Sequence, residues 1–113
     1  MSEIKEITEA LLKFRDARDW RQFHNSKDLA VAVSIEASEL LELFLWKGNE
    51  EVSVDRLKEE LADILSYCLL LAEKHGLDVR QIIMDKIDQN AAKYPIDKSK
   101  GNATKYTDYD RIQ

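Results

Sequence analysis

The stretch "SIEASELLELFLW", residues 34–46, sets three glutamates at intervals of three residues into an otherwise mostly apolar segment. The apolar side chains surround most of the circumference of a helix. The whole chain of 113 residues contains only three glycines and one proline, which favours long helices joined by short turns. The sequence therefore predicts an all-α fold, and the carboxylates within an apolar helix require an explanation.

Apolar residues at helical spacing predict a bundle of four helices. The helices are expected at about residues 2–19, 26–47, 53–75 and 78–94. Ser26 and Ser53 are N-cap candidates, and Gly48 and Gly76 suit the left-handed conformation that often follows a helix end.

Residues 95–113 have neither helical nor strand periodicity and are expected to form an extended C-terminal tail. Tyr106, Tyr109 and Ile112 are the side chains that could anchor it against the bundle. A chain of this length can form one domain with one core, so residues 1–113 are predicted to be a single domain.

Composition and charge exclude several classes of protein. Acidic residues outnumber basic ones by 22 to 17, and no basic run is present, which argues against a nucleic-acid partner. The longest apolar run, at residues 64–72, is much shorter than the roughly 20 residues that span a bilayer, and the charged N-terminus does not resemble a signal peptide. The single cysteine, Cys68, is expected to be a small buried hydrophobe, and the protein is placed in a reducing cytoplasm.

The carboxylates form two pairs with the same spacing. Glu36 and Glu39 are separated by three residues, so they lie about 60° apart on one helix face. Glu60 and Asp63 repeat this spacing on the next predicted helix, where Tyr67 continues the same stripe. Two helices thus each offer a pair of carboxylates that can reach a common point.

Spacing alone does not identify a site, because Glu6 and Glu9 have the same interval on a face expected to be solvated. The two selected pairs differ in being surrounded by apolar residues, where an ionised carboxylate is unfavourable unless it is paired or binds a metal. No Lys or Arg occurs at 29–46 or 59–73. A metal site is therefore favoured over a buried salt bridge, which remains the alternative.

Four carboxylates without a thiol or imidazole at suitable spacing suit Mg²⁺ or Mn²⁺. A di-iron bundle is disfavoured, because its Glu-x-x-His pattern is absent: Arg21 precedes His24 by three residues, and Ala72 precedes His75. Mg²⁺ held by carboxylates commonly completes its coordination with waters and substrate phosphates. The site therefore points to phosphate chemistry.

The ExxE and ExxD pairs in "EASELLELFLWK" and "EELADILSYCLLLA" resemble the MazG-like all-α nucleoside triphosphate pyrophosphohydrolases. Agreement extends to "RDWRQFH", to "KIDQNAAKYP" and to "SKGNATKYTDY", and it is closest to the dCTP pyrophosphatase branch of that superfamily. The resemblance covers about residues 15–109.

This resemblance implies Mg²⁺-dependent hydrolysis of a deoxynucleoside triphosphate, with dCTP or a modified dCTP as the expected substrate, to the monophosphate and pyrophosphate. It implies that Glu36, Glu39, Glu60 and Asp63 bind the metal, and Glu36 and Glu39 are the candidate catalytic residues. The residues implied to contact the substrate are Trp20, Arg21, Gln22, Phe23, His24, Trp46, Tyr67, Asn90, Lys93, Tyr94, Lys105 and Tyr106. Leu11 stands where the vertebrate enzymes align a substrate-contacting histidine, which leaves the base preference less defined than the reaction.

Two other interpretations remain open: a relative that acts on a different triphosphate, and a non-enzymatic helical module whose carboxylates pair with a partner protein. The helices predicted at 26–47 and 53–75 carry more apolar surface than a lone bundle of this length can cover. A homo-oligomer is therefore expected, with a dimer as its basic unit, and the resemblance implies a tetramer.

Overall fold

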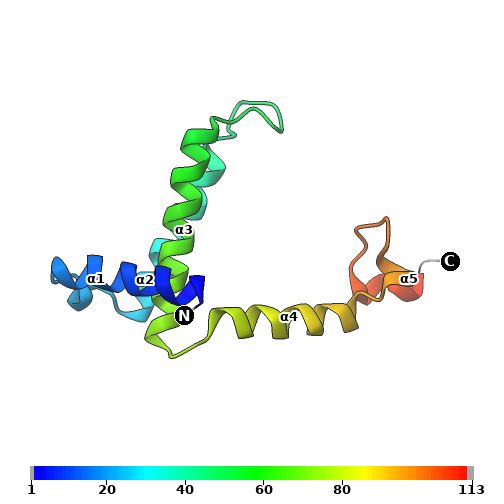
Figure 1. The fold of residues 1–113 in the computed structure, drawn as a ribbon. Helices are drawn as coiled ribbons and strands as arrows, with labels where there is room; N and C mark the ends of the chain where they lie inside the picture. The colour runs from blue at the N-terminus through cyan, green and yellow to red at the C-terminus, as the bar shows by residue number, and fades with distance from the viewer. Residues whose placement is uncertain (1, 112–113) are drawn as a thin grey trace. The chain divides into compact units, whose positions relative to one another are not determined.

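The elements described for residues 2–111 of the computed structural model are all helical, which confirms the predicted all-α class (Figure 1). They are α1 (Glu3–Ala17), η1 (Arg21–Phe23), α2 (Ser26–Glu42), α3 (Val54–Lys74), α4 (Val79–Lys93), α5 (Ile96–Ser99) and η2 (Tyr106–Arg111). Within that range, no helix is both long and apolar enough to cross a membrane.

The chain divides into two compact units, one ending at Asp78 and the other beginning at Val79. In the first unit, α2 and α3 lie side by side and are joined by a loop at residues 43–53, while α1 packs on α3 (Figure 1). The second unit contains α4, α5 and η2. Since α4 belongs to the second unit, neither unit by itself is a four-helix bundle, and the single-domain organisation stays a prediction.

Side-chain caps fix where the central helices begin. The Ser53 hydroxyl accepts a hydrogen bond from the Arg56 amide at 3.4 Å, as predicted for the N-cap of α3. The N-cap of α2 is Asn25, whose side chain accepts from the Asp28 amide at 2.8 Å, so the prediction of Ser26 was wrong by one residue. The side-chain carbonyl oxygen of Asn caps the free amides of the first helical turn as effectively as a Ser hydroxyl does.

The end of α2 differs from the prediction. The helix ends at Glu42, and the left-handed residue after it is Trp46, with a φ of 63°, whereas Gly48 was expected there. Successive short turns from Leu43 to Lys47 replace the last predicted helical turn. The other predicted left-handed glycine, Gly76, is confirmed with a φ of 65°.

The buried core of the first unit is small. Its buried apolar residues are Leu29, Leu43, Leu70 and Ala72. By contrast, Leu41 and Leu65 are 65% and 59% exposed. Cys68 is exposed as well, which corrects the expectation that it is buried. It lies three residues after Leu65 on α3, so it belongs to the same uncovered helix face.

The C-terminal segment is more ordered than predicted, because α5 and η2 form within the expected extended tail. The Ser99 hydroxyl donates to the carbonyl of Pro95 at 2.6 Å and closes the α5 turn. Tyr94 makes edge-to-face contacts with Tyr106 and with Tyr109, which is only 7% exposed. Aromatic contacts thus anchor the tail within its own unit, while the predicted anchor Ile112 lies outside the described residues.

Replacement of Trp46 by glycine is expected to leave the free energy of unfolding unchanged or to raise it by up to about 1 kcal/mol. The left-handed backbone is unfavourable for a residue with a Cβ, and the indole is fully exposed, so it contributes no burial. Trp46→Ala is the matched control, because alanine keeps the Cβ and gains no such relief. Urea unfolding measures both variants, and a clear loss of stability in both would show that the indole packs against something.

Candidate metal centre and substrate-contact residues

The packing of α2 against α3 brings three carboxylates together. Glu36 on α2 and Glu60 and Asp63 on α3 each offer one oxygen atom, and these atoms all lie within 4.8 Å of one another. Glu60 and Asp63 share one face of α3 because they are one turn apart. Glu36 and Glu60 are half-buried, whereas Asp63 is exposed, so the cluster has an open side.

The cluster has no positively charged partner among residues 2–111, which the structure describes. Within that range, no Lys or Arg forms an ion pair with Glu36, Glu60 or Asp63. One buried oxygen of Glu36 and one of Glu60, the Oε2 atom in both, have no hydrogen-bond partner. The alternative of a salt bridge within this chain is therefore not realised among the described residues.

Glu36 is the carboxylate most affected by these surroundings. Burial, together with the neighbouring Glu39, Glu60 and Asp63, raises the pKa of Glu36 to about 7. The metal-free cluster therefore holds a proton near neutral pH, because the site disfavours a further negative charge. A divalent cation would remove that repulsion.

Glu39 occupies a different position from the other three predicted ligands. It is exposed one turn beyond Glu36 and lies close enough to raise the pKa of Glu36. It is not part of the group whose oxygens lie within 4.8 Å of one another. The structure thus brings together three of the four carboxylates that the sequence singled out.

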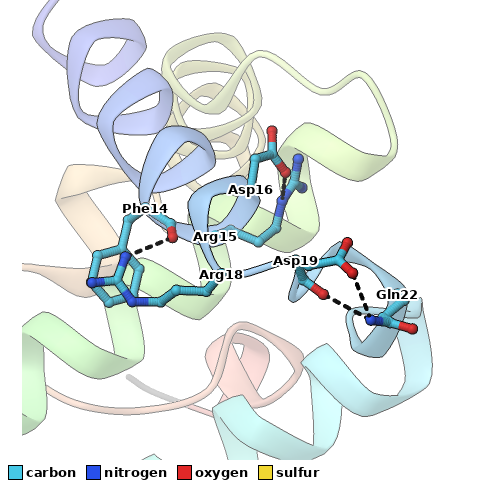
Figure 2. Close-up of polar contacts among 6 residues, drawn as sticks. All are labelled: Phe14, Arg15, Asp16, Arg18, Asp19 and Gln22. Carbon is cyan, nitrogen blue, oxygen red and sulfur yellow. Dashed lines mark hydrogen bonds and ion pairs between the residues drawn. The ribbon is translucent and has the colours of Figure 1, made fainter.

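Polar and aromatic contacts position Trp20 in the turn after α1. The guanidinium of Arg18 lies 3.7 Å from the centre of the Phe14 ring, and Phe14 meets Trp20 edge to face at 5.7 Å between ring centres. The Gln22 amide donates to the backbone carbonyl and to the carboxylate of Asp19, which closes the next turn (Figure 2). Gln22, predicted to contact substrate, therefore also holds this turn together.

The remaining aromatic candidates of the first unit are largely accessible. Trp20 and Phe23 are 43% and 61% exposed, and Trp46 is fully exposed on the loop after α2. Tyr67 is half-buried on α3, one turn beyond Asp63, so it follows the predicted metal ligands Glu60 and Asp63 along the helix. Exposed indole rings have free faces on which a flat base can stack.

Arg21 and His24 line a cavity of about 380 Å³, which also includes Arg15 and Lys74. His24 has a buried Nδ1 atom without a hydrogen-bond partner, and burial together with the charge of Arg15 lowers its pKa. Sequence reasoning missed Arg15 and Lys74, because they are far apart in the chain and no local motif links them.

The candidates of the second unit gather around one aromatic cluster. The Lys93 ammonium lies 5.3 Å from the centre of the Tyr106 ring, and Tyr94 contacts the same ring edge to face. Lys105 immediately precedes Tyr106, and the Asn90 carbonyl accepts a hydrogen bond from the Tyr94 amide at 2.8 Å. The end of α4 and the start of η2 therefore bring Lys93 and Tyr94 to Tyr106, which Lys105 directly precedes.

Several known pyrophosphatases are similar to this chain in sequence or in structure. A bovine protein named dCTP pyrophosphatase 1 is 39% identical, over 93% of this chain and 67% of its own length. The human protein of the same name is 33% identical, over 93% of this chain and 66% of its own length. A crystal structure described as a pyrophosphatase from Archaeoglobus fulgidus matches with a TM-score of 0.79 and 34% identity, over 84% of this chain and 94% of that one.

The model of the MazG-like family matches residues 31–109, a range that includes all four predicted metal ligands and most of the predicted substrate contacts. With the two similar proteins and the similar structure, this match confirms the resemblance that the carboxylate pairs and the aromatic blocks indicated. The chain belongs to the MazG-like family of nucleoside triphosphate pyrophosphohydrolases.

Proposed function

We propose that this protein hydrolyses dCTP, or a modified dCTP, to the nucleoside monophosphate and pyrophosphate in a reaction that requires Mg²⁺, for which Mn²⁺ can substitute. The observation that carries the proposal is the cluster of Glu36, Glu60 and Asp63, in which two buried carboxylate oxygens lack a partner. Its family and the dCTP pyrophosphatases at 33% to 39% identity support the reaction and the substrate.

The carboxylates fit the proposed ion. An all-oxygen donor set suits Mg²⁺, and the unpartnered oxygens of Glu36 and Glu60 are free to coordinate it. Glu36, Glu60 and Asp63 would hold the ion, with Glu39 as a fourth ligand from the same face of α2. When bound, Mg²⁺ neutralises charge on the triphosphate and lowers the pKa of water.

Glu39 is the proposed general base. It is exposed beside the cluster, so it can accept the proton of an attacking water. The water oxygen adds to the α-phosphorus as the bond to the bridging oxygen of pyrophosphate breaks. Glu36 would contribute as a ligand that holds the ion beside the reacting phosphate.

The aromatic residues are proposed to bind the base and the sugar. Trp20 and Trp46 present exposed indole rings, and each stacking contact with a base contributes about 1 to 3 kcal/mol. Phe23 and Tyr67 are proposed as further substrate contacts, and Gln22 maintains the turn beside Trp20. In the second unit, Lys93 and Lys105 are proposed to contact phosphate oxygens, beside Asn90, Tyr94 and Tyr106.

A homo-oligomer, a dimer or a tetramer, is proposed as the active form. The faces of α2 and α3 expose Val31, Ile35, Leu41, Leu61 and Leu65, all more than 40% accessible. Apolar faces of this kind are rare on monomers and usually mark an interface. A second copy of this chain would cover them. A cytoplasmic location stays a prediction.

Asp63→Asn and Glu36→Gln are expected to lower kcat/KM by about 100-fold or more, since each removes a charged ligand of the proposed ion. Both variants should remain folded, because they relieve repulsion within the cluster. Pyrophosphate release from dCTP measures the activity, and Glu6→Gln, on the exposed face of α1, is the matched control. Wild-type activity in Asp63→Asn would contradict the proposed centre.

The metal-free protein should lose stability as the pH rises through the range from about 4.5 to 7. The folded-state pKa of Glu36 is about 7 and its ordinary value is 4.5, so the native state binds more protons within that range. In EDTA, melting temperatures between pH 5 and pH 8 should therefore fall more steeply for the wild type than for Glu36→Gln. Equal slopes would show that Glu36 has no raised pKa. Adding Mg²⁺ at pH 8 should restore wild-type stability by mass action.

The products of dCTP hydrolysis test the proposed reaction. Cleavage between the α- and β-phosphates gives dCMP and pyrophosphate, whereas inorganic phosphate with dCDP would rule the reaction out. Trp46→Ala should raise KM more than it lowers kcat, because base stacking is shared by the ground and transition states. Phosphorus NMR and steady-state kinetics over a panel of triphosphates measure both effects, and the panel also shows whether another base is preferred.

Leu65→Lys is expected to shift the protein from an oligomer toward a monomer at micromolar concentration. A lysine in place of an apolar side chain would leave an unpaired charge in the proposed interface. Light scattering after size-exclusion chromatography gives the mass, and Leu65→Met, which conserves volume, should keep the wild-type mass. A monomeric wild-type protein would contradict the proposed assembly.

A further inference from the structure

The cavity of about 380 Å³ in the first unit lies apart from the metal centre. It is lined by residues of α1, η1, the start of α2 and the end of α3, together with His24. These residues are Leu12, Arg15, Asp16, Arg21, His24, Leu29, Leu70, Glu73 and Lys74. Its volume falls within the range of about 300 to 1,000 Å³ that is typical of small-molecule sites.

The cavity carries more positive than negative charge in a protein whose net charge is −5. Arg15 is already committed to Asp16, since its Nε lies 2.8 Å from a carboxylate oxygen (Figure 2). Arg21 and Lys74 make no ion pair with any residue of the described range, 2–111. Arg21 and Lys74 therefore face the cavity without an ion pair among the described residues, although Arg21 is near enough to Asp16 to lower its pKa. The cavity lining has three cations, Arg15, Arg21 and Lys74, and two carboxylates, Asp16 and Glu73.

His24 adds an unsatisfied polar atom to the same wall. Its Nδ1 is buried and has no hydrogen-bond partner, and such an atom destabilises a protein unless a ligand or a water satisfies it. Burial and the charge of Arg15 lower the pKa of the ring, which favours the neutral imidazole. A neutral ring can donate through Nδ1 to an anionic oxygen.

The cavity and the metal centre occupy different levels of the same pair of helices. Leu29 precedes Glu36 by about two turns on α2, and Leu70 follows Asp63 by about two turns on α3, which separates the two levels by about 10 Å. A hydrogen bond of 2.9 Å between Ser26 Oγ and His75 Nε2 ties the start of α2 to the end of α3 at the level of the cavity.

The charges of the two sites are opposite. A phosphate would be repelled by the metal-free carboxylates, whereas Arg21 and Lys74 attract it. Arg and Lys are the usual partners of phosphate oxygens, and the Leu12, Leu29 and Leu70 side chains give the cavity an apolar wall beside them.

We propose that this cavity binds a small phosphate-bearing anion, held by Arg21 and Lys74 and by the free nitrogen of His24, independently of the metal centre. Arg21 and His24, which the family resemblance implied to contact the substrate of the metal centre, are assigned to this cavity instead. The binding itself does not depend on hydrolysis. If the proposed reaction holds, its two products, dCMP and pyrophosphate, are both phosphate-bearing anions. Occupancy of the cavity would then rise as these products accumulate.

The test is calorimetric titration of the whole protein in EDTA with inorganic phosphate, pyrophosphate or dCMP at constant ionic strength. The double variant Arg21→Gln/Lys74→Gln should bind about tenfold more weakly or worse than the wild type. Lys13→Gln/Lys58→Gln is the matched control, because it removes the same charge from exposed sites on α1 and α3 and should bind like the wild type. Tighter binding of dCMP than of both inorganic anions would identify a nucleotide site. Weaker binding of dCMP than of the inorganic anions would identify a site for inorganic anions.

A second readout uses the two histidines of the chain. In nitrogen-detected NMR, the bound anion should shift the imidazole resonances of His24 more than those of His75, whose Nε2 is already bonded to Ser26. No heat and no His24 shift with any probe, or equal affinity in the two double variants, would overturn the proposal. Asp63→Asn should retain binding, so failure of the metal centre and failure of this cavity are distinguishable.

Discussion

The packing of α2 against α3 is the contact on which the candidate site depends. It buries Leu29 and Leu70 and at the same time brings Glu36 to Glu60 and Asp63. Burial and the repulsion between carboxylates so close together raise the pKa of Glu36. The hydrophobic contact thus holds an arrangement of charge that is unfavourable by itself, which is how functional sites commonly differ from the rest of a fold.

The buried core that supports this arrangement of carboxylates is small. The first unit buries few large side chains, while long apolar stripes of α2 and α3 stay accessible. Association of such stripes would add buried area to the helices that carry the carboxylates. Folding, assembly and metal binding are therefore expected to be coupled, because each stabilises the same pair of helices.

The same helix pair carries two polar centres of opposite sign. The carboxylates are suited to a cation, and the cavity lined by Arg21 and Lys74 is suited to an anion. Their separation along α2 and α3 limits direct neutralisation of one by the other, and the described residues show no ion pair between them. Each centre is therefore left with charge that a ligand can satisfy.

The sequence by itself determined the helical class, the N-cap at Ser53, the left-handed Gly76 and the carboxylate pairs, because each depends on residues within a few positions of one another. Only the tertiary structure decided which carboxylates lie together and where α2 ends before the left-handed Trp46. It also decided that Cys68 is exposed. It also placed Arg15, Arg21 and Lys74 around one cavity at the end of α3. Contacts between residues far apart in the chain depend on how helices pack, and local periodicity carries no information on that.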